Sequence, residues 1–317
     1  MNHLPSLLFS ILFTTASIAE PYTPSEIYTI AEEATFELLV NGRLEGTGFL
    51  ISADGYAASV FHAMKEDATL EIRSPELGRL PISLVAHNRG TDTVLLQLPC
   101  RKKPYKYLRL NSIIPAPGDS IYLMGTPIFR HRVFIPGAVA RKGTTFEYYN
   151  GNYVEVLHAT GIAAKGCSGG PWLDAKGKVV GMQAANITIR DSHQGVASIV
   201  PAFTIEQLLE KKSDIHLPTL QMAVEGVWEQ APDYIKGLPP KTKGLVIRQV
   251  PKNGVAAKAG VQEWDILLSI DGKHFEESAE FVQYLRSQPA DHIHKLDIMN
   301  KNGKNRRTIQ LKPHLLP

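Results

Sequence analysis

The feature that most constrains this fold is a succession of short apolar runs separated by tight-turn dipeptides, from Phe36 to about Val200. Four of the dipeptides end in glycine: Asn41-Gly42, Asp54-Gly55, Asn150-Gly151 and Lys176-Gly177. Such pairs supply the positive φ that two-residue hairpin turns require. The runs have the length and composition of strands, as at 36–40, 48–52, 94–98, 121–124, 153–158 and 179–183. Many short strands with turns between them predict an all-β barrel or sandwich.

A proline-rich loop at 115–118 divides this region, which predicts two barrels at about 34–110 and 119–200. A capping box at Thr23 and Glu26 predicts a short helix before the first barrel, and a similar pattern at Thr204 predicts another after the second. Residues 220–313 mix strand-like runs with two short helical patterns, which predicts a small α+β domain. The expected boundaries are 1–19 for a signal peptide, 20–203 for the barrels, 204–219 for a linker and 220–313 for the last domain.

The first residues predict export. Residues 4–13 are uncharged and strongly apolar. Ser17 and Ala19 supply small side chains at the two positions that a signal peptidase recognises, so cleavage is expected after Ala19. An uncleaved anchor is the alternative, although the run is shorter than the ~20 residues that a bilayer span needs. We therefore expect a periplasmic or extracellular protein with no stable membrane span.

Composition excludes several classes of protein. Hydrophobic residues make up 44% and charged residues 21%, as in ordinary globular domains. The formal net charge is only +3, so the composition shows no excess of basic residues of the kind that binds nucleic acid. The only cysteines, Cys100 and Cys167, are too few for a disulfide framework, and the sequence does not decide whether these two form a single disulfide bond.

The strongest chemical signal is the glycine-rich run 166–171, with Ser168 at its centre. A serine nucleophile needs an exposed hydroxyl on a tight turn and backbone N–H groups that converge on the developing oxyanion. The N–H groups of Gly166 and Ser168 are the expected donors. Taken alone, a serine among glycines is equally well an ordinary loop.

A general base and an orienting acid are also available. His62 ends an apolar strand pattern, and Asp92 stands just before another. Taken singly, a histidine in the first position is more often a packed residue, and an aspartate in the second is more often a turn residue. Together with Ser168 they give the chain order His, Asp, Ser of two-barrel serine proteases. The combination predicts a catalytic triad.

The motifs around these residues resemble the HtrA (Deg) proteases. The resemblance rests on 46–56 leading to His62, on Thr91-Asp92, on 166–171 and on 177–182, and it resumes in 243–247, 256–261 and 265–273, which resemble a PDZ domain. It covers about residues 25–313 and implies a chymotrypsin-like double β-barrel protease domain followed by one PDZ domain.

The resemblance also implies a function. Members of this family cleave unfolded or damaged exported proteins without ATP or a cofactor, bind C-terminal peptides, and often form homotrimers. By resemblance, His62 is the general base, Asp92 its orienter and Ser168 the nucleophile, with no metal. Cys167 departs from the family's usual asparagine and is an alternative nucleophile, displaced by one position. An inactive, chaperone-like relative that keeps all three residues remains the second hypothesis.

Binding residues follow from the same match of motifs. Ile162, six positions before Ser168, is expected on the floor of an apolar pocket that favours small or aliphatic side chains. Residues Gln183, Ala184 and Ala185 are expected to pair with the substrate backbone. The PDZ groove is expected to use Gly244, Leu245 and Val246 as its receiving strand, facing Phe281 and Leu285 on a helix. His292 and His294 share one strand face, which we interpret as solvated because two histidines alone make an incomplete metal site.

Overall fold

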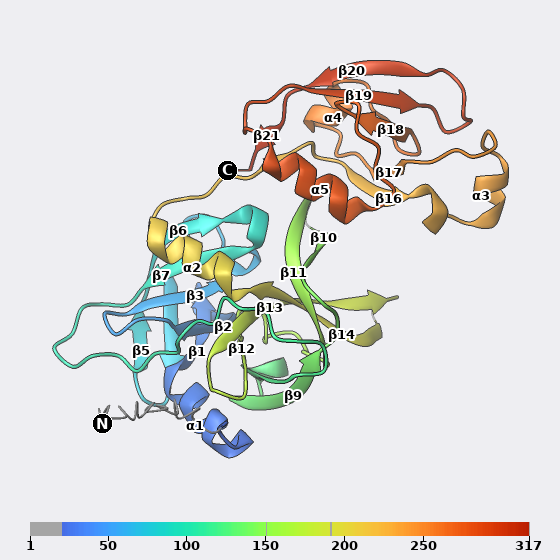
Figure 1. Ribbon diagram of the computed structural model, residues 1–317. Helices are drawn as coiled ribbons and strands as arrows, with labels where there is room; N and C mark the ends of the chain where they lie inside the picture. Colours follow the sequence, from blue (N-terminus) through green and yellow to red (C-terminus); the bar gives the residue numbers. More distant parts are fainter. Residues whose placement is uncertain (1–20, 150, 191, 317) are drawn as a thin grey trace, which may run out of the picture.

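The computed structural model describes residues 21–149, 151–190 and 192–316. The predicted signal peptide lies outside these ranges, as does Asn150 of the third turn dipeptide. The ribbon divides into a larger β-rich body and a smaller domain that holds most of the last hundred residues (Figure 1). This arrangement confirms the predicted class, two curled sheets followed by a small α+β domain.

The first sheet has seven antiparallel strands in the order β5-β4-β1-β2-β3-β7-β6. Its strands are β1 (Thr35–Val40), β2 (Arg43–Leu50), β3 (Tyr56–Val60), β4 (Leu70–Ser74), β5 (Gly78–Pro81), β6 (Ser83–Asn88) and β7 (Thr93–Gln97). The β1–β2 turn forms as the dipeptide predicts, with φ of 51° at Asn41 and 74° at Gly42. Short 3-10 turns at η1 (Phe61–Ala63) and η2 (Arg89–Thr91) follow β3 and precede β7.

The second sheet closes on itself. Its order is β10-β11-β14-β13-β12-β8-β9, and β11 also pairs with β9, so six of its strands complete a ring. The strands are β8 (Ser120–Gly125), β9 (Val133–Val139), β10 (Thr145–Tyr149), β11 (Asn152–Thr160), β12 (Pro171–Leu173), β13 (Val179–Ile189) and β14 (Ser192–Pro201). One 3-10 turn, η3 (Pro127–Phe129), lies between β8 and β9. Trp172 is fully buried in the core of this barrel.

Two helices flank the barrels. Helix α1 (Pro24–Ala34) begins with the predicted capping box, in which Thr23 and Glu26 bond reciprocally. Helix α2 (Ala202–Lys211) begins after Pro201, so the predicted cap at Thr204 is wrong; the Thr204 hydroxyl instead donates back to the Pro201 carbonyl. Ile205 and Leu208 of α2 pack into the barrel core, so the predicted linker at 204–219 starts too early.

The C-terminal domain is a five-stranded sheet, in the order β16-β17-β18-β19-β20, with one long helix against it. Its elements are β16 (Ala223–Gly226), η4 (Val227–Glu229), α3 (Pro232–Lys236), β17 (Leu245–Gln249), α4 (Val255–Lys258), β18 (Ile266–Ile270), α5 (Ser278–Ser287), β19 (His294–Met299) and β20 (Arg307–Leu311). A two-stranded ribbon, β15 (Pro218–Thr219) with β21 (His314–Leu315), ties the start of this domain to its end. In Figure 1 the β10–β11 hairpin leaves the barrels and reaches the underside of α5.

Candidate active site

His62 and Asp92 are joined by two hydrogen bonds. Nδ1 of His62 lies 2.7 Å from Oδ2 of Asp92, and the His62 main-chain N–H donates to Oδ1 at 2.8 Å. The Asp92 side chain is buried, whereas the His62 side chain is 29% exposed. Oδ2 therefore holds the imidazole ring and Oδ1 holds the main chain of His62, while Nε2 of the ring is left for another partner.

The pKa of His62 reflects opposing effects. Desolvation lowers it, but the hydrogen bond from the ring to Asp92 and the negative charge of that carboxylate together outweigh desolvation. The result is a pKa above the ordinary value of histidine. An imidazole with this environment is a stronger base than a free one.

A third contact to Asp92 was not expected from the sequence. Tyr149, the last residue of β10, donates its hydroxyl to Oδ2 of Asp92 at 2.7 Å. Burial is the main cause that raises the pKa of Tyr149, so this hydroxyl stays protonated and donates. Tyr149, His62 and Asp92 line one pocket of about 230 Å³, together with Phe61, Met64, Arg89, Asn152 and Val154.

The turn that carries Ser168 comes from the second barrel but is held by the first. Thr47 of β2 donates its main-chain N–H to the Ser168 carbonyl and its hydroxyl to the Gly166 carbonyl, each at 2.8 Å. A Cβ at Gly46 would lie 2.8 Å from the Ser168 carbonyl oxygen and 3.9 Å from Cβ of Ala63, the neighbour of His62. A Cβ at Gly169 would lie 2.0 Å from the Thr47 carbonyl. Only glycines permit this close approach, which holds the serine turn of the second barrel against β2 of the first.

The Ser168 hydroxyl donates to the Ala184 carbonyl at 3.4 Å, and no hydrogen bond between the serine and His62 occurs among the described residues. Catalytic hydrogen bonds are often long before substrate binds, so this geometry does not remove Ser168 as a candidate nucleophile. The N–H groups of Gly166 and Ser168 make no hydrogen bond within the described part of the chain, which leaves both amides for a ligand. Gly166 itself has a φ of +102°, in the region that glycine favours.

Cys167 is buried and unpaired with Cys100, which is exposed. Its sulfur faces Gly125, where a Cβ would lie 3.0 Å away. Burial raises the pKa of this thiol to about 12. A nucleophilic cysteine needs a lowered pKa and access, so these observations oppose Cys167 as the nucleophile.

The strand expected to receive substrate is only partly free. Gln183 exchanges main-chain hydrogen bonds with Gly169 and Gly170, and its side chain accepts from Trp172 and donates to the Ala185 carbonyl. The prediction that Gln183 pairs with substrate is therefore wrong, because its groups are already used. Strand β12 ends its pairing at Met182, so the open edge of β13 begins at Ala184, where a bulge interrupts the ladder to β14.

Ile162 lies in the loop after β11 and is 54% exposed. The side chain does not form an enclosed floor in this arrangement. The predicted pocket preference stays a prediction.

Family models and known proteins agree with this architecture. Residues 46–182 match the model of the trypsin-like peptidase domain, and residues 246–298 match that of the PDZ domain. A probable periplasmic serine endoprotease DegP-like from Pseudomonas putida (strain GB-1) is 29% identical over 276 residues, which cover 86% of this chain and 56% of the relative. A protein of the same name from Bartonella henselae is 25% identical, with 86% and 53% covered. The chain thus spans about half the length of the curated relatives it matches.

Solved structures extend the agreement to the fold. HtrA-type protease AlgW with decapeptide superposes with a TM-score of 0.66 at 18% identity, covering 93% of this chain and 99% of the other. The serine endoprotease from Yersinia pestis gives 0.62 at 18% identity, covering 94% and 100%. The chain therefore combines a trypsin-like peptidase domain with a PDZ domain, and it is similar to HtrA-type proteases.

The structure of the PDZ domain corrects one prediction. Strand β17 lies inside its sheet: Leu245 pairs with Gly226 of β16 on one side and with Leu267 of β18 on the other. Gly244, Leu245 and Val246 therefore have no free edge for a peptide. The free edge beside α5 belongs to β16, while Phe281 and Leu285 are buried core residues of α5.

The free edge of β16 is in contact with the protease domain. Tyr153 of β11 accepts a hydrogen bond from the Val224 N–H at 2.7 Å and donates to the Val224 carbonyl at 3.1 Å. Tyr153, Phe146 and Tyr148 belong to the same apolar cluster as Phe281 and Leu285. The hairpin of one domain thus completes the core of the other.

Arg286 of α5 adds a polar link across this interface. Its guanidinium donates to the Tyr153 carbonyl at 2.5 Å and to the Gly90 carbonyl at 3.1 Å, and lies 5.1 Å from the ring centre of Phe146. Desolvation lowers the pKa of Arg286 to about 10, which leaves it charged at neutral pH. Because Gly90 lies in η2, two residues before Asp92, α5 contacts the segment that carries the acid of the candidate triad.

Proposed function

We propose that this protein is an exported serine endopeptidase of the HtrA type that hydrolyses peptide bonds of unfolded or damaged proteins. The observation that carries the proposal is the His62–Asp92 pair of the first barrel, with its raised imidazole pKa, together with a serine turn that is bonded to the same barrel through Thr47 and bears two unbonded amides. The periplasmic names of its relatives and the apolar N-terminus support export. Within the described residues no helix is long and apolar enough to cross a bilayer.

In the proposed reaction, Nε2 of His62 removes the proton from the Ser168 hydroxyl as the oxygen attacks the substrate carbonyl. Asp92 orients the ring and stabilises the imidazolium. The N–H groups of Gly166 and Ser168 receive the oxyanion, and the imidazolium then protonates the leaving amine. Rotation of the Ser168 side chain away from the Ala184 carbonyl is the step that brings its hydroxyl to His62. No cofactor or metal takes part in this scheme.

The substrate backbone is proposed to add to the open edge of β13 at Ala184 and Ala185. Its side chain before the cut bond would lie near Ile162, which favours small or aliphatic residues. A peptide library digested with the purified protein tests this specificity. A preference for lysine or arginine before the cut would contradict it.

The PDZ domain is proposed to capture peptide strands or chain ends at the edge of β16. Since Tyr153 bonds to both main-chain groups of Val224, a peptide must displace this side chain to pair there. Peptide binding would then release the β10–β11 hairpin, which also carries Tyr149. Labelling of Ser168 by a fluorophosphonate, with and without peptides that have hydrophobic C-termini, tests whether the site responds to the PDZ domain.

An inactive protein that only holds its partners is the second candidate, favoured by the bond of Ser168 to Ala184 rather than to His62. Degradation of casein by the wild type beside Ser168→Ala separates the two. Equal residual activity would remove the enzyme proposal. A homotrimer, proposed from the family, is tested by light scattering during size-exclusion chromatography.

A further inference from the structure

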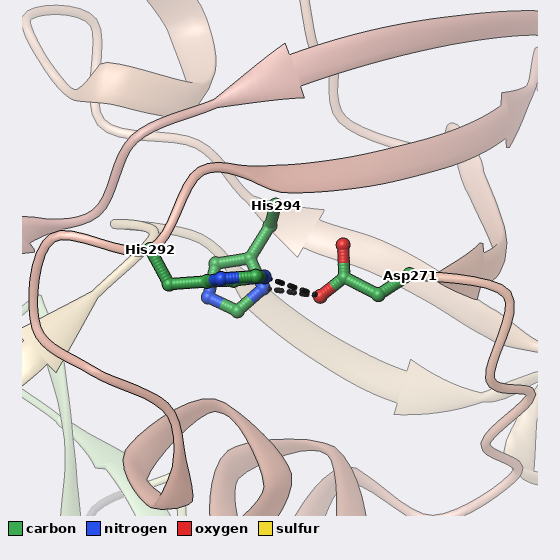
Figure 2. Close-up of side chains that lie close together, drawn as sticks. All are labelled: Asp271, His292 and His294. Carbon is green, nitrogen blue, oxygen red and sulfur yellow. Dashed lines mark hydrogen bonds and ion pairs between the residues drawn. The ribbon is translucent and has the colours of Figure 1, made fainter.

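Three potential metal ligands converge in the PDZ domain, away from the candidate triad. Asp271 follows β18, His292 precedes β19, and His294 is the first residue of β19. Oδ2 of Asp271 lies 3.3 Å from Nε2 of His292 and 2.6 Å from Nδ1 of His294 (Figure 2). One ligand atom from each of the three residues falls within 4.8 Å of the other two. The expectation of a solvated histidine pair is therefore wrong for His294, which is fully buried.

The carboxylate of this cluster is held by groups outside it. The main-chain N–H of Lys295 donates to Oδ1 of Asp271 at 2.7 Å, and the Tyr284 hydroxyl of α5 donates to Oδ2 at 3.0 Å. The main chain of Asp271 also donates to the Lys295 carbonyl at 2.7 Å. Outer partners of this kind orient a ligating carboxylate and reduce the reorganisation on metal binding.

Hydrogen bonding alone leaves the cluster poorly satisfied. One oxygen, Oδ2 of Asp271, faces the Tyr284 hydroxyl, Nε2 of His292 and Nδ1 of His294 at the same time. A dication between the carboxylate and the two rings would replace their competition for one oxygen by three metal–ligand bonds. The side chain of His292 is 38% exposed, which gives an ion access from solvent.

We propose that Asp271, His292 and His294 bind a divalent transition-metal ion of the zinc type. Two imidazoles and one carboxylate are donors that zinc accepts, with water as the fourth ligand. Zinc–ligand bonds of about 2.0–2.2 Å place neighbouring ligand atoms a little over 3 Å apart. The observed separations of 2.6 and 3.3 Å need only small side-chain shifts to reach that value.

Binding would connect three parts of the PDZ domain: the turn after β18, the start of β19 and, through Tyr284, helix α5. An ion that binds the folded domain and not the unfolded chain raises its stability. Because α5 also carries Arg286, the same helix links the proposed metal site to the interface with the protease domain. The inference does not depend on proteolytic activity.

Calorimetric titration of zinc chloride into the chelator-treated Ser168→Ala protein tests the proposal, with cobalt(II) absorption as a second probe of nitrogen and oxygen ligands. We expect one site per chain and a zinc-dependent rise in melting temperature. His292→Ala, which removes a partly exposed side chain and should fold, is expected to weaken binding by about tenfold or more. His314→Ala, at an exposed position in β21, is the matched control and should bind as the parent does.

Failure of zinc to bind the parent protein would overturn the proposal. So would equal affinity and equal stabilisation in the His292→Ala and His314→Ala variants, because zinc would then bind elsewhere. Either result would leave Asp271, His292 and His294 as a hydrogen-bonded cluster without a metal.

Discussion

The contact between Tyr153 and the edge of β16 gives the sharpest prediction. Tyr153→Phe removes one buried oxygen and with it two hydrogen bonds, to the N–H and the carbonyl of Val224. The ring can keep its edge-on contact with Tyr148, whose centre lies 5.0 Å away. The contacts of Arg286 with the Tyr153 and Gly90 carbonyls are main-chain contacts and also remain. The variant therefore isolates the hydroxyl.

The expected cost follows from these two bonds. In the docked form the variant leaves the N–H and the carbonyl of Val224, a buried residue, without partners, so the cost of about 1–3 kcal/mol per unsatisfied group applies. Together they should weaken docking by about 2 kcal/mol or more, which is roughly a 30-fold or larger change in the docking equilibrium. If a peptide binds only the separated form, its apparent affinity should rise by up to about the same factor.

Two measurements in the Ser168→Ala background check this value: the rate of tryptic cleavage in the segment 212–217, and the affinity for a fluorescent peptide with a hydrophobic C-terminus. Tyr148→Phe is the matched control, because it removes the same atom from the same hairpin and its hydroxyl is buried without a partner. Faster cleavage and tighter peptide binding are expected only in Tyr153→Phe. If both variants behave alike, the hydroxyl does not hold the domains together.

Three further outcomes are expected. Hydrolysis needs a neutral His62, whose pKa is raised, so the acidic limb of the pH profile of kcat/KM should lie above pH 6.5. Activity should increase as the pH rises through this limb. A pH profile of Asp92→Asn should show the limb shifted to lower pH, because the carboxylate that raises the pKa of His62 is gone. Tyr149→Phe removes a hydrogen-bond donor to Asp92 and so strengthens the attraction between the carboxylate and the imidazolium, which should move the same limb to higher pH. An unchanged limb would show that the Tyr149 hydroxyl does not affect His62 through Asp92. Iodoacetamide should modify Cys100 but not Cys167 in the native protein and both after denaturation, as counted by mass spectrometry; modification of Cys167 in the native state would contradict its burial.

The barrels could be predicted because their signals are local. Hairpin turns depend on two adjacent residues, and those at Asn41-Gly42 and Lys176-Gly177 contain the positive-φ glycines that the dipeptides predicted. The capping box at Thr23 formed for the same reason. The box predicted at Thr204 did not form, because the helix that buries Ile205 and Leu208 against the barrel starts three residues earlier, with Pro201 at its N-cap.

The peptide-binding edge could not be identified from the sequence. Strands β16 and β17 both have strand-like composition, but which of them is an edge depends on pairing with β18, which is distant in the chain. The same limit applies to Gln183, whose hydrogen-bonding groups are used by a turn from another part of the barrel.

The candidate triad could be predicted from the sequence because its three members lie in recognisable motifs, but the residues that surround it could not be predicted. Tyr149 reaches Asp92 from a hairpin 57 positions away, and it was not singled out from the sequence. Asp271 joins His292 and His294 in a similar manner, across a separation that strand periodicity does not reveal.

The glycines packed between the barrels limit how this site can change over evolution. With the Thr47 carbonyl 2.0 Å from a hypothetical Cβ at Gly169, almost any substitution there would push the two barrels apart. New substrate preferences should therefore arise at exposed positions such as Ile162 rather than in the serine turn. Laboratory selection for altered specificity has most room at those positions.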